Sequence, residues 1–198
     1  MANWCSTRLT ISHENEKELE KLSKLITKWT SKDYEKNGFG HDWLGNIVLG
    51  AKIGTVDEHK DTDLRCRGSI GDIYCDGNQL FINTETAWVP ILQMWKKLLD
   101  KYLPDAELLY EANECGCGLY CTNDPCMKGR YIIDTWGNIE GIEKDYDASE
   151  ETVREVLQKV LNTTETDIDA LLTMFEKSPV SEDMSVHKWE FSDIDEWD

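Results

Sequence analysis

The sequence predicts an α+β protein built on an antiparallel sheet, and three patterns lead to this class. Segments that alternate apolar and polar residues, as strands do, are interspersed with segments whose apolar residues recur every three or four positions, as in amphipathic helices. A hairpin signal joins two extended segments near the middle of the chain. Finally, a chain of 198 residues, 40% hydrophobic and 30% charged, is long and apolar enough to bury a substantial core.

The N-terminal segment is predicted to be a strand followed by a helix. One face of the strand consists of alternate residues, Cys5, Thr7, Leu9 and Ile11. Ser12 offers an N-cap for the helix, because its hydroxyl can accept a hydrogen bond from a backbone N–H of the first turn. The apolar stripe of that helix consists of Leu19, Leu22, Ile26 and Trp29. A short buried helix is expected within residues 42–53, which are apolar but contain two glycines.

The middle of the chain is predicted to be a hairpin, then a helix, then a strand. The extended runs 64–75 and 79–84 are joined at Asp76-Gly77, a dipeptide that tolerates the positive φ of a tight turn. The second amphipathic helix starts near Pro90 and stops at Pro104. Its apolar stripe consists of Ile91, Leu92, Trp95, Leu98, Leu99 and Tyr102. Residues 106–113 and 131–136 are expected to be further strands.

Up to residue 113 the order of elements is strand, helix, extra helix, strand, strand, helix, strand. This is the βαββαβ order of a ferredoxin-like unit, with helices on one face of an antiparallel sheet. We therefore expect a ferredoxin-like domain over residues 1–138 and an acidic helical extension or subdomain over residues 139–198.

The extension holds most of the charge of the chain. Residues 139–198 contain 18 Asp and Glu but five Lys and Arg, whereas the whole chain has a net charge of −18. Such a field repels nucleic acid and anionic membrane and attracts basic protein surfaces. We therefore expect a basic protein partner, with no direct binding to nucleic acid or membrane.

The extension is not a low-complexity segment, because it carries helix signals. Ser149 can cap a helix whose apolar stripe is Val153, Val156, Leu157, Val160 and Leu161. A second helix is expected to begin at Thr164, with Asp167 at its third position. Residues 186–191 can form a strand. The final segment, 192–198, is interpreted as a loose acidic tail.

Several motifs in the first two thirds of the chain are similar to the YubB-type ferredoxin-like proteins of phages, plasmids and gut bacteria. The opening MANWCSTRL (residues 1–9) resembles the start of that family, although an Asn commonly stands there in place of Thr7. Residues 84–90, TETAWVP, resemble its Thr-Ala-Trp-x-Pro signature, and the Tyr-Leu-Pro run at 102–104 and the turn at 116–120 also match. The resemblance covers residues 1–136. It implies a ferredoxin-like fold and a mobile-element setting, and it carries no assigned activity or catalytic residue.

Four cysteines within twelve residues suggest an alternative role. They are Cys115, Cys117, Cys121 and Cys126. Four thiolates at a turn can form a tetrahedral zinc site, although usual zinc knuckles pair C-x2-C with a distant second pair. The competing interpretation is a set of reduced thiols packing a hairpin, with no cofactor. A small zinc-binding accessory domain is therefore the alternative function.

No catalytic residue is assigned, so the chain is not expected to be an enzyme. The four histidines form no sequence pattern with a nucleophile, and the motifs of nucleotide binding, zinc proteases and serine hydrolases are absent from the sequence. With no signal peptide or apolar run long enough to span a membrane, a cytoplasmic location is expected.

The leading hypothesis is a binding protein whose acidic C-terminal surface engages a basic partner. Its most concrete form is an anti-defence inhibitor, anti-CRISPR or anti-restriction in kind, that imitates nucleic acid. The predicted partner-binding residues are Glu150, Glu151, Glu155, Asp167, Asp169, Trp189, Asp193, Asp195, Glu196, Trp197 and Asp198. The two tryptophans are candidate interface anchors. Trp189 can equally tie the tail to the sheet.

Overall fold

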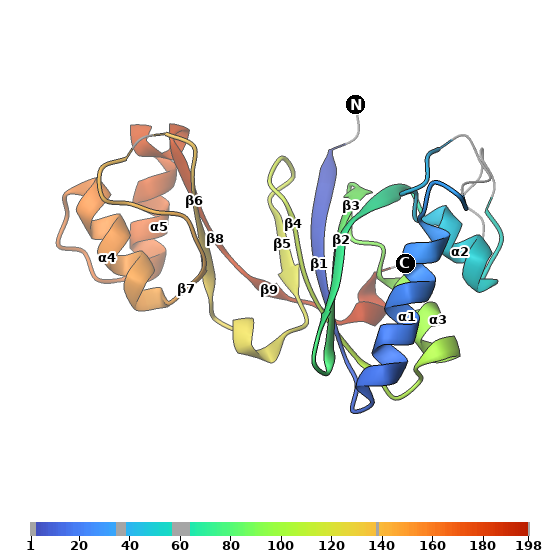
Figure 1. The fold of residues 1–198 in the computed structure, drawn as a ribbon. Helices are drawn as coiled ribbons and strands as arrows, with labels where there is room; N and C mark the ends of the chain where they lie inside the picture. Colours follow the sequence, from blue (N-terminus) through green and yellow to red (C-terminus); the bar gives the residue numbers. More distant parts are fainter. Residues whose placement is uncertain (1–2, 35–38, 57–63, 138, 198) are drawn as a thin grey trace. The chain divides into compact units, whose positions relative to one another are not determined.

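A computed structural model describes residues 3–34, 39–56, 64–137 and 139–197 (Figure 1). These residues form a mixed α+β structure with five α-helices, a six-stranded sheet and a three-stranded sheet. The chain folds as two compact units. The first consists of residues 1–124 and 192–198, and the second of residues 125–191. These boundaries differ from the expected one after residue 138. The strand at 131–135 belongs to the second unit, and the last residues of the chain, 192–198, belong to the first.

The first unit is an antiparallel sheet with three helices. Its elements are β1 (Trp4–Ser12), α1 (Glu16–Trp29), α2 (Gly45–Ala51), β2 (Gly68–Asp76), β3 (Gln79–Ala87), α3 (Leu92–Tyr102), β4 (Glu107–Glu114) and β5 (Leu119–Thr122). The strand order is β2-β3-β1-β4-β5, and the short β9 (Glu190–Phe191), at the junction of the units, is the sixth strand of this sheet. Every pairing among β1 to β5 is antiparallel.

The core of the first unit lies between the sheet and its helices, which cover one face of the sheet (Figure 1). The register places Leu9 of β1 between Ile82 of β3 and Tyr110 of β4, and all three are buried. The alternation expected for β1 is confirmed, since Cys5, Thr7, Leu9 and Ile11 are all buried. The expected stripes of α1 and α3 face the same core, with Trp95 fully buried in α3.

In the first unit, the cap and the turn predicted from the sequence exist, but they lie one to three residues further along the chain than expected. Ser12 is the last residue of β1, and the N-cap of α1 is Asn15, whose side chain accepts a hydrogen bond of 3.2 Å from the backbone of Lys17. The β2–β3 hairpin is confirmed. Its turn residues are Gly77 and Asn78, and Gly77 has the positive φ of 56° that glycine tolerates best.

The second unit is a three-stranded antiparallel sheet with two helices. Its elements are η1 (Pro125–Met127), β6 (Tyr131–Thr135), β7 (Asp145–Ala148), α4 (Glu150–Leu161), α5 (Ile168–Glu176), η2 (Pro179–Glu182), β8 (Met184–Lys188) and β9. The strand order is β7-β6-β8. Its core contains Ile133, Val153, Leu157, Leu171 and Phe175. This hydrophobic core is separate from that of the first unit, so each unit has its own core, as a domain does.

The capping signals of the second unit were partly correct. Ser149 is the N-cap of α4 and accepts a hydrogen bond of 3.0 Å from the backbone of Thr152. The second expected helix does not begin at Thr164, because Asp167 is itself the N-cap and accepts from the backbone of Ala170 at 2.8 Å. Among the described residues, no helix is both long and apolar enough to cross a lipid bilayer.

Candidate functional site

Six acidic side chains of the second unit lie on α4, on α5 or at the N-cap of α5. The unit carries fifteen Asp and Glu against seven Lys and Arg, a net charge of −8, and the first unit has a net charge of −10 over nearly twice the length. The predicted residues Glu150, Glu151 and Glu155 lie on α4, and Asp167 and Asp169 lie at the start of α5. All five are exposed. These carboxylates therefore have fixed places on helices that the core of the unit anchors.

The connection between α4 and α5 is held by hydrogen bonds to side chains of α4. Arg154 pairs with Glu150 at 2.8 Å and also donates to the carbonyl oxygen of Thr166 at 3.0 Å. Gln158 donates to the carbonyl oxygen of Glu165 at 2.5 Å. The Glu165 carboxylate accepts the N–H groups of Asp167 at 2.9 Å and Thr166 at 2.7 Å, and these bonds lower the pKa of Glu165. The two helices are thus linked by a defined connection.

Some of the predicted carboxylates serve the helices themselves. Glu150 is paired with Arg154, and Asp167 is the N-cap of α5. Glu151 and Glu155 differ, because they lie one turn apart and have the same charge, an arrangement that disfavours a helix by a few tenths of a kcal/mol. Lys159 lies one turn beyond Glu155, but its ammonium group donates to the carbonyl oxygens of residues 140 and 141 at 3.2 Å. Glu151 lies in the first turn of α4, where the macrodipole favours an acidic side chain, whereas Glu155 lies beyond that turn and has no such explanation.

Trp189 is part of the interior of the second unit. Its side chain is 5% exposed, and its indole N–H donates to the carbonyl oxygen of Tyr146 in β7 at 3.0 Å. Its backbone N–H donates to the carbonyl oxygen of Arg130. Trp189 therefore ties the end of β8 to the second unit, which is one of the two roles that the sequence left open, and it offers no exposed anchor to a partner.

The remaining predicted residues belong to the first unit. Residues 192–197, here called the C-terminal strap, pack against α3 and β4, and they include Asp193, Asp195, Glu196 and Trp197. Asp198, also predicted to bind a partner, lies outside the described residues. The residues predicted to bind a partner are therefore distributed over two separately packed units.

The strap is anchored by a set of specific hydrogen bonds. The Tyr110 hydroxyl donates to the carbonyl oxygen of Ser192 at 2.8 Å, and the indole N–H of Trp197 donates to that hydroxyl at 2.8 Å. Gln93 of α3 donates to the carbonyl oxygen of Ile194 at 3.2 Å. Burial raises the pKa of the Tyr110 hydroxyl well above its ordinary range and Cys121 acts in the same direction, while the hydrogen bonds with Ser192 and Trp197 partly offset the rise. The prediction of a loose acidic tail is wrong, because Ile194 and Trp197 pack on the core of the first unit.

A pocket of about 500 Å³ lies beside the strap. It is lined by Lys96, Leu99, Asp100, Pro104, Ala106, Leu108, Asn123, Asp193, Ile194, Asp195 and Glu196. Lys96 forms an ion pair with Asp195, which raises the pKa of Lys96 and lowers that of Asp195. Sequence reasoning found the strap carboxylates but missed the residues from α3 and β4. One feature of the sequence could have indicated that the strap packs on the first unit. Ile194 and Trp197 are two apolar residues, three positions apart, in an otherwise acidic segment.

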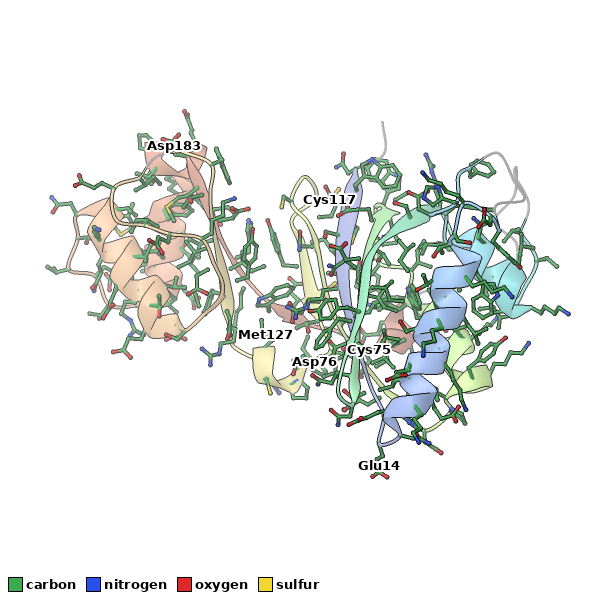
Figure 2. All side chains as sticks on the ribbon, in the orientation of Figure 1. Glu14, Cys75, Asp76, Cys117, Met127 and Asp183 are labelled. Carbon is green, nitrogen blue, oxygen red and sulfur yellow. The ribbon has the colours of Figure 1, made fainter. Side chains whose placement is uncertain are left out.

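The four cysteines proposed for zinc are not gathered into a site. Cys115 and Cys117 are exposed in the β4–β5 turn, where Figure 2 shows Cys117 at the tip, while Cys121 is buried within β5 and Cys126 is exposed in η1 of the second unit. In the described part of the chain, no three His, Cys, Asp or Glu side chains are placed to hold a metal ion. The geometry thus gives the zinc alternative no support.

The β4–β5 turn is stabilised by a carboxylate. Glu114 accepts the backbone N–H groups of Gly116 at 2.9 Å and Cys117 at 2.6 Å. The Cys117 thiol and these N–H groups lower the pKa of Glu114, and the carboxylate in turn raises the pKa of Cys117. In the core, burial raises the pKa of the Cys5 thiol to about 11. Neither thiol has the lowered pKa of an activated nucleophile.

Comparison with known proteins gives no family for this chain: no family model matches it, and neither a curated protein nor a solved structure shows significant similarity.

Proposed function

We propose that this protein is a non-enzymatic binding protein that engages a basic protein surface through the acidic side chains of α4 and α5. The observation that carries the proposal is the exposed pair Glu151 and Glu155. The two carboxylates repel each other one turn apart, and the lysine of α4, Lys159, is directed to loop carbonyls instead. A basic partner would compensate this like-charge repulsion.

The fixed geometry of the second unit favours recognition over mere solubility. The hydrogen bonds of Arg154 and Gln158 and the stripe around Leu157 hold the carboxylates on a packed scaffold. Fixed charges lose less conformational freedom on binding than charges on a floppy chain. They can therefore match the spacing of charges on one partner, as an imitation of a phosphate backbone requires.

We further propose that the partner is a nucleic-acid-binding effector of a host defence system and that the protein inhibits it, in the manner of an anti-CRISPR or anti-restriction protein. The resemblance of residues 1–136 to YubB-type proteins of mobile elements supports this setting. The strand order β2-β3-β1-β4, with helices on one face, supports a ferredoxin-like description of the first unit. The net charge of −18 disfavours direct binding to nucleic acid.

The test measures binding of the full chain to purified effectors, a CRISPR ribonucleoprotein and a restriction endonuclease, at about 0.05 M and about 0.5 M salt. Charge reversal by Glu151→Lys with Glu155→Lys is expected to weaken binding. The matched control, Glu14→Lys with Asp105→Lys, makes the same change of net charge in the first unit, where Glu14 and Asp105 are exposed (Figure 2 labels Glu14).

We expect binding that weakens at high salt, is lost in the α4 variant and persists in the control. Competition with the effector's own DNA or RNA should accompany it, since the acidic helices would occupy the same basic groove. Binding that is indifferent to salt, or lost equally in both variants, would contradict a role for α4.

A further inference from the structure

The pocket beside the C-terminal strap has three walls, all from the first unit. The end of α3 supplies Leu99 and Asp100, β4 supplies Leu108, and the strap supplies residues 193–196. It is an open pocket of about 500 Å³, large enough for a side chain or a short peptide segment. Its residues are distinct from those of α4 and α5, so what it binds is a separate question from the proposed function.

Part of the pocket lining is apolar. Its apolar lining residues are Leu99, Pro104, Ala106, Leu108 and Ile194. Leu99 and Leu108 are themselves buried against the core, at 4% and 8% exposure, so they provide a fixed surface. An apolar lining of this kind favours a ligand with an aliphatic portion, because contact removes hydrocarbon from water.

The charged part of the pocket lining is predominantly negative. It carries four carboxylates, those of Asp100, Asp193, Asp195 and Glu196, and one ammonium group, that of Lys96. Lys96 is engaged by Asp195. Glu196 accepts a hydrogen bond of 2.7 Å from the Ser192 hydroxyl, a neutral donor that leaves the charge of the carboxylate in place. The pocket thus has an excess of three negative charges.

The position of the pocket on α3 adds to this field. Asp100 stands two residues before the end of the helix at Tyr102, where the macrodipole is already negative and a basic residue would be favoured. The macrodipole disfavours an acidic residue at that point, although Asp100 also interacts favourably with the Lys96 ammonium group one turn earlier. A cation bound in the pocket would interact favourably with both the carboxylate and the helix end.

The acidic wall is held in place before any ligand arrives. The strap is fixed by the hydrogen bonds from Tyr110 to Ser192, from Trp197 to Tyr110 and from Gln93 to Ile194. Because these bonds lie within the first unit, the pocket does not depend on the position of the second. A preorganised wall reduces the entropy lost on binding.

The ligand that fits this chemistry is an organic cation with an apolar stem. In the described residues, no three metal-ligating side chains converge, so the pocket does not offer a coordination site for a bare metal ion. Lys and Arg lay their methylene stems on apolar surfaces and keep their charged ends in a polar region. We propose that the pocket binds an Arg or Lys side chain of a basic, partly apolar peptide segment. The stem lies on Leu99, Leu108 and Ile194, and the cation lies between Asp193 and Glu196.

The test is a titration of the isotope-labelled full chain with acetyl-Leu-Arg-Leu-Lys-amide, followed by NMR. The comparison peptide, acetyl-Leu-Gln-Leu-Gln-amide, has the same apolar residues without the cations. We expect the basic peptide to shift the backbone amide signals of Leu99, Ile194 and Glu196, and the neutral peptide to leave them unchanged. Equal binding of both peptides, or shifts confined to other residues, would overturn the proposal.

Variants locate the site independently of the peptide comparison. Asp193→Asn with Glu196→Gln should weaken binding of the basic peptide about fivefold or more, since two charge partners are removed. The matched control, Asp72→Asn with Glu85→Gln, changes two exposed carboxylates of β2 and β3 and should bind like the wild type. The indole signal of Trp197 reports in each spectrum whether the strap remains docked.

A third variant separates this site from the proposed function. Glu151→Lys with Glu155→Lys should leave peptide binding unchanged, because these residues belong to the other unit. Loss of peptide binding in that variant would assign the peptide to α4 and overturn the pocket proposal. If this variant still binds the peptide but no longer binds the effector, both assignments are supported.

Discussion

The indole N–H of Trp197 donates a hydrogen bond of 2.8 Å to the hydroxyl of Tyr110, which lies 87 positions earlier in the chain. The same hydroxyl donates to the carbonyl oxygen of Ser192, so one phenol holds the strap at both of its ends. Residues that were expected to be a solvated tail are in this way part of the packing of the first unit.

Replacement of Trp197 tests this anchoring. Trp197→Ala removes both the packing of the indole on the core and its hydrogen bond, and should destabilise the first unit by about 1–3 kcal/mol. Trp197→Phe keeps most of the packing and should cost about 1 kcal/mol, the usual value of one hydrogen bond. Denaturant unfolding measures both. Trp4→Ala is the control. Because Trp4 is 54% exposed, its replacement should lower the free energy of unfolding by less. Equal stability of wild type and Trp197→Ala would restore the loose-tail interpretation.

Replacement of Leu157 tests the independence of the two cores. Leu157 of α4 is fully buried in the core of the second unit, so Leu157→Ala should cost about 2–5 kcal/mol through the cavity it leaves. NMR signals of the second unit should lose dispersion at lower denaturant concentration than those of β1 and β3. Thr173→Ala, at an exposed position of α5, should change stability little. Simultaneous loss of both sets of signals would show that the units unfold together.

The stability of the second unit should depend on the ionisation of Glu165. Its pKa is lowered from the ordinary value of 4.5 by the N–H groups of Asp167 and Thr166, so the folded state favours the carboxylate. This contribution is fully present above the ordinary pKa and is lost as the pH falls through the lowered one. Glu165→Gln should therefore be less stable than the wild type above about pH 5, with a difference that vanishes in acid.

Circular dichroism during denaturation at a series of pH values checks the role of Glu165. Glu155→Gln is the control, because it removes the same charge but neither of the two hydrogen bonds. Parallel pH curves for the wild type and Glu165→Gln would contradict the assignment.

The cysteines should react in an order set by exposure and by the Glu114 carboxylate. Cys115 and Cys117 are both exposed, but Glu114 raises the pKa of Cys117 and leaves less thiolate at a given pH. With iodoacetamide at about pH 8, Cys115 should be modified before Cys117, and Cys5, buried with a pKa of about 11, should be modified last. Mass spectrometry after digestion follows the order.

A second variant isolates the effect of the carboxylate on the Cys117 thiol. Glu114→Gln should accelerate the modification of Cys117 and leave the rate at Cys126, which lies in the second unit, unchanged. If Cys115 and Cys117 react at one rate in both proteins, the thiol is not coupled to Glu114.

The elements that were predicted correctly are those with a strong local signal. Ser149 followed by the stripe of Val153 and Leu157 was sufficient to predict α4, because capping and amphipathicity act within a few turns. The alternation through Leu9 and Ile11 predicted β1 for the same reason. Caps were misplaced at Ser12 and Thr164, because Asn15 and Asp167, each three residues further along the chain, are the residues that cap α1 and α5.

The elements that were missed depend on contacts distant in sequence. β7 is a polar edge strand, Asp145–Ala148, whose one buried residue gives no alternation to detect. β5 has four residues and is defined by its pairing with β4. The burial of Trp189 and the docking of the strap depend on partners far along the chain, Tyr146 and Tyr110 respectively. The pocket followed from that docking and was therefore invisible in the sequence.

The hydrogen bond of 2.9 Å from the backbone of Ser192 to the carbonyl oxygen of Thr122 closes the first unit across an insertion of 67 residues, 125–191. During synthesis the ribosome releases β1 to β5 first, then the whole second unit, and only then the strap. The residues of the second core have all emerged once residue 191 is made, whereas the first unit lacks the partners of Tyr110 until residue 197 is made. The part of the protein that is made first is thus the part that is completed last.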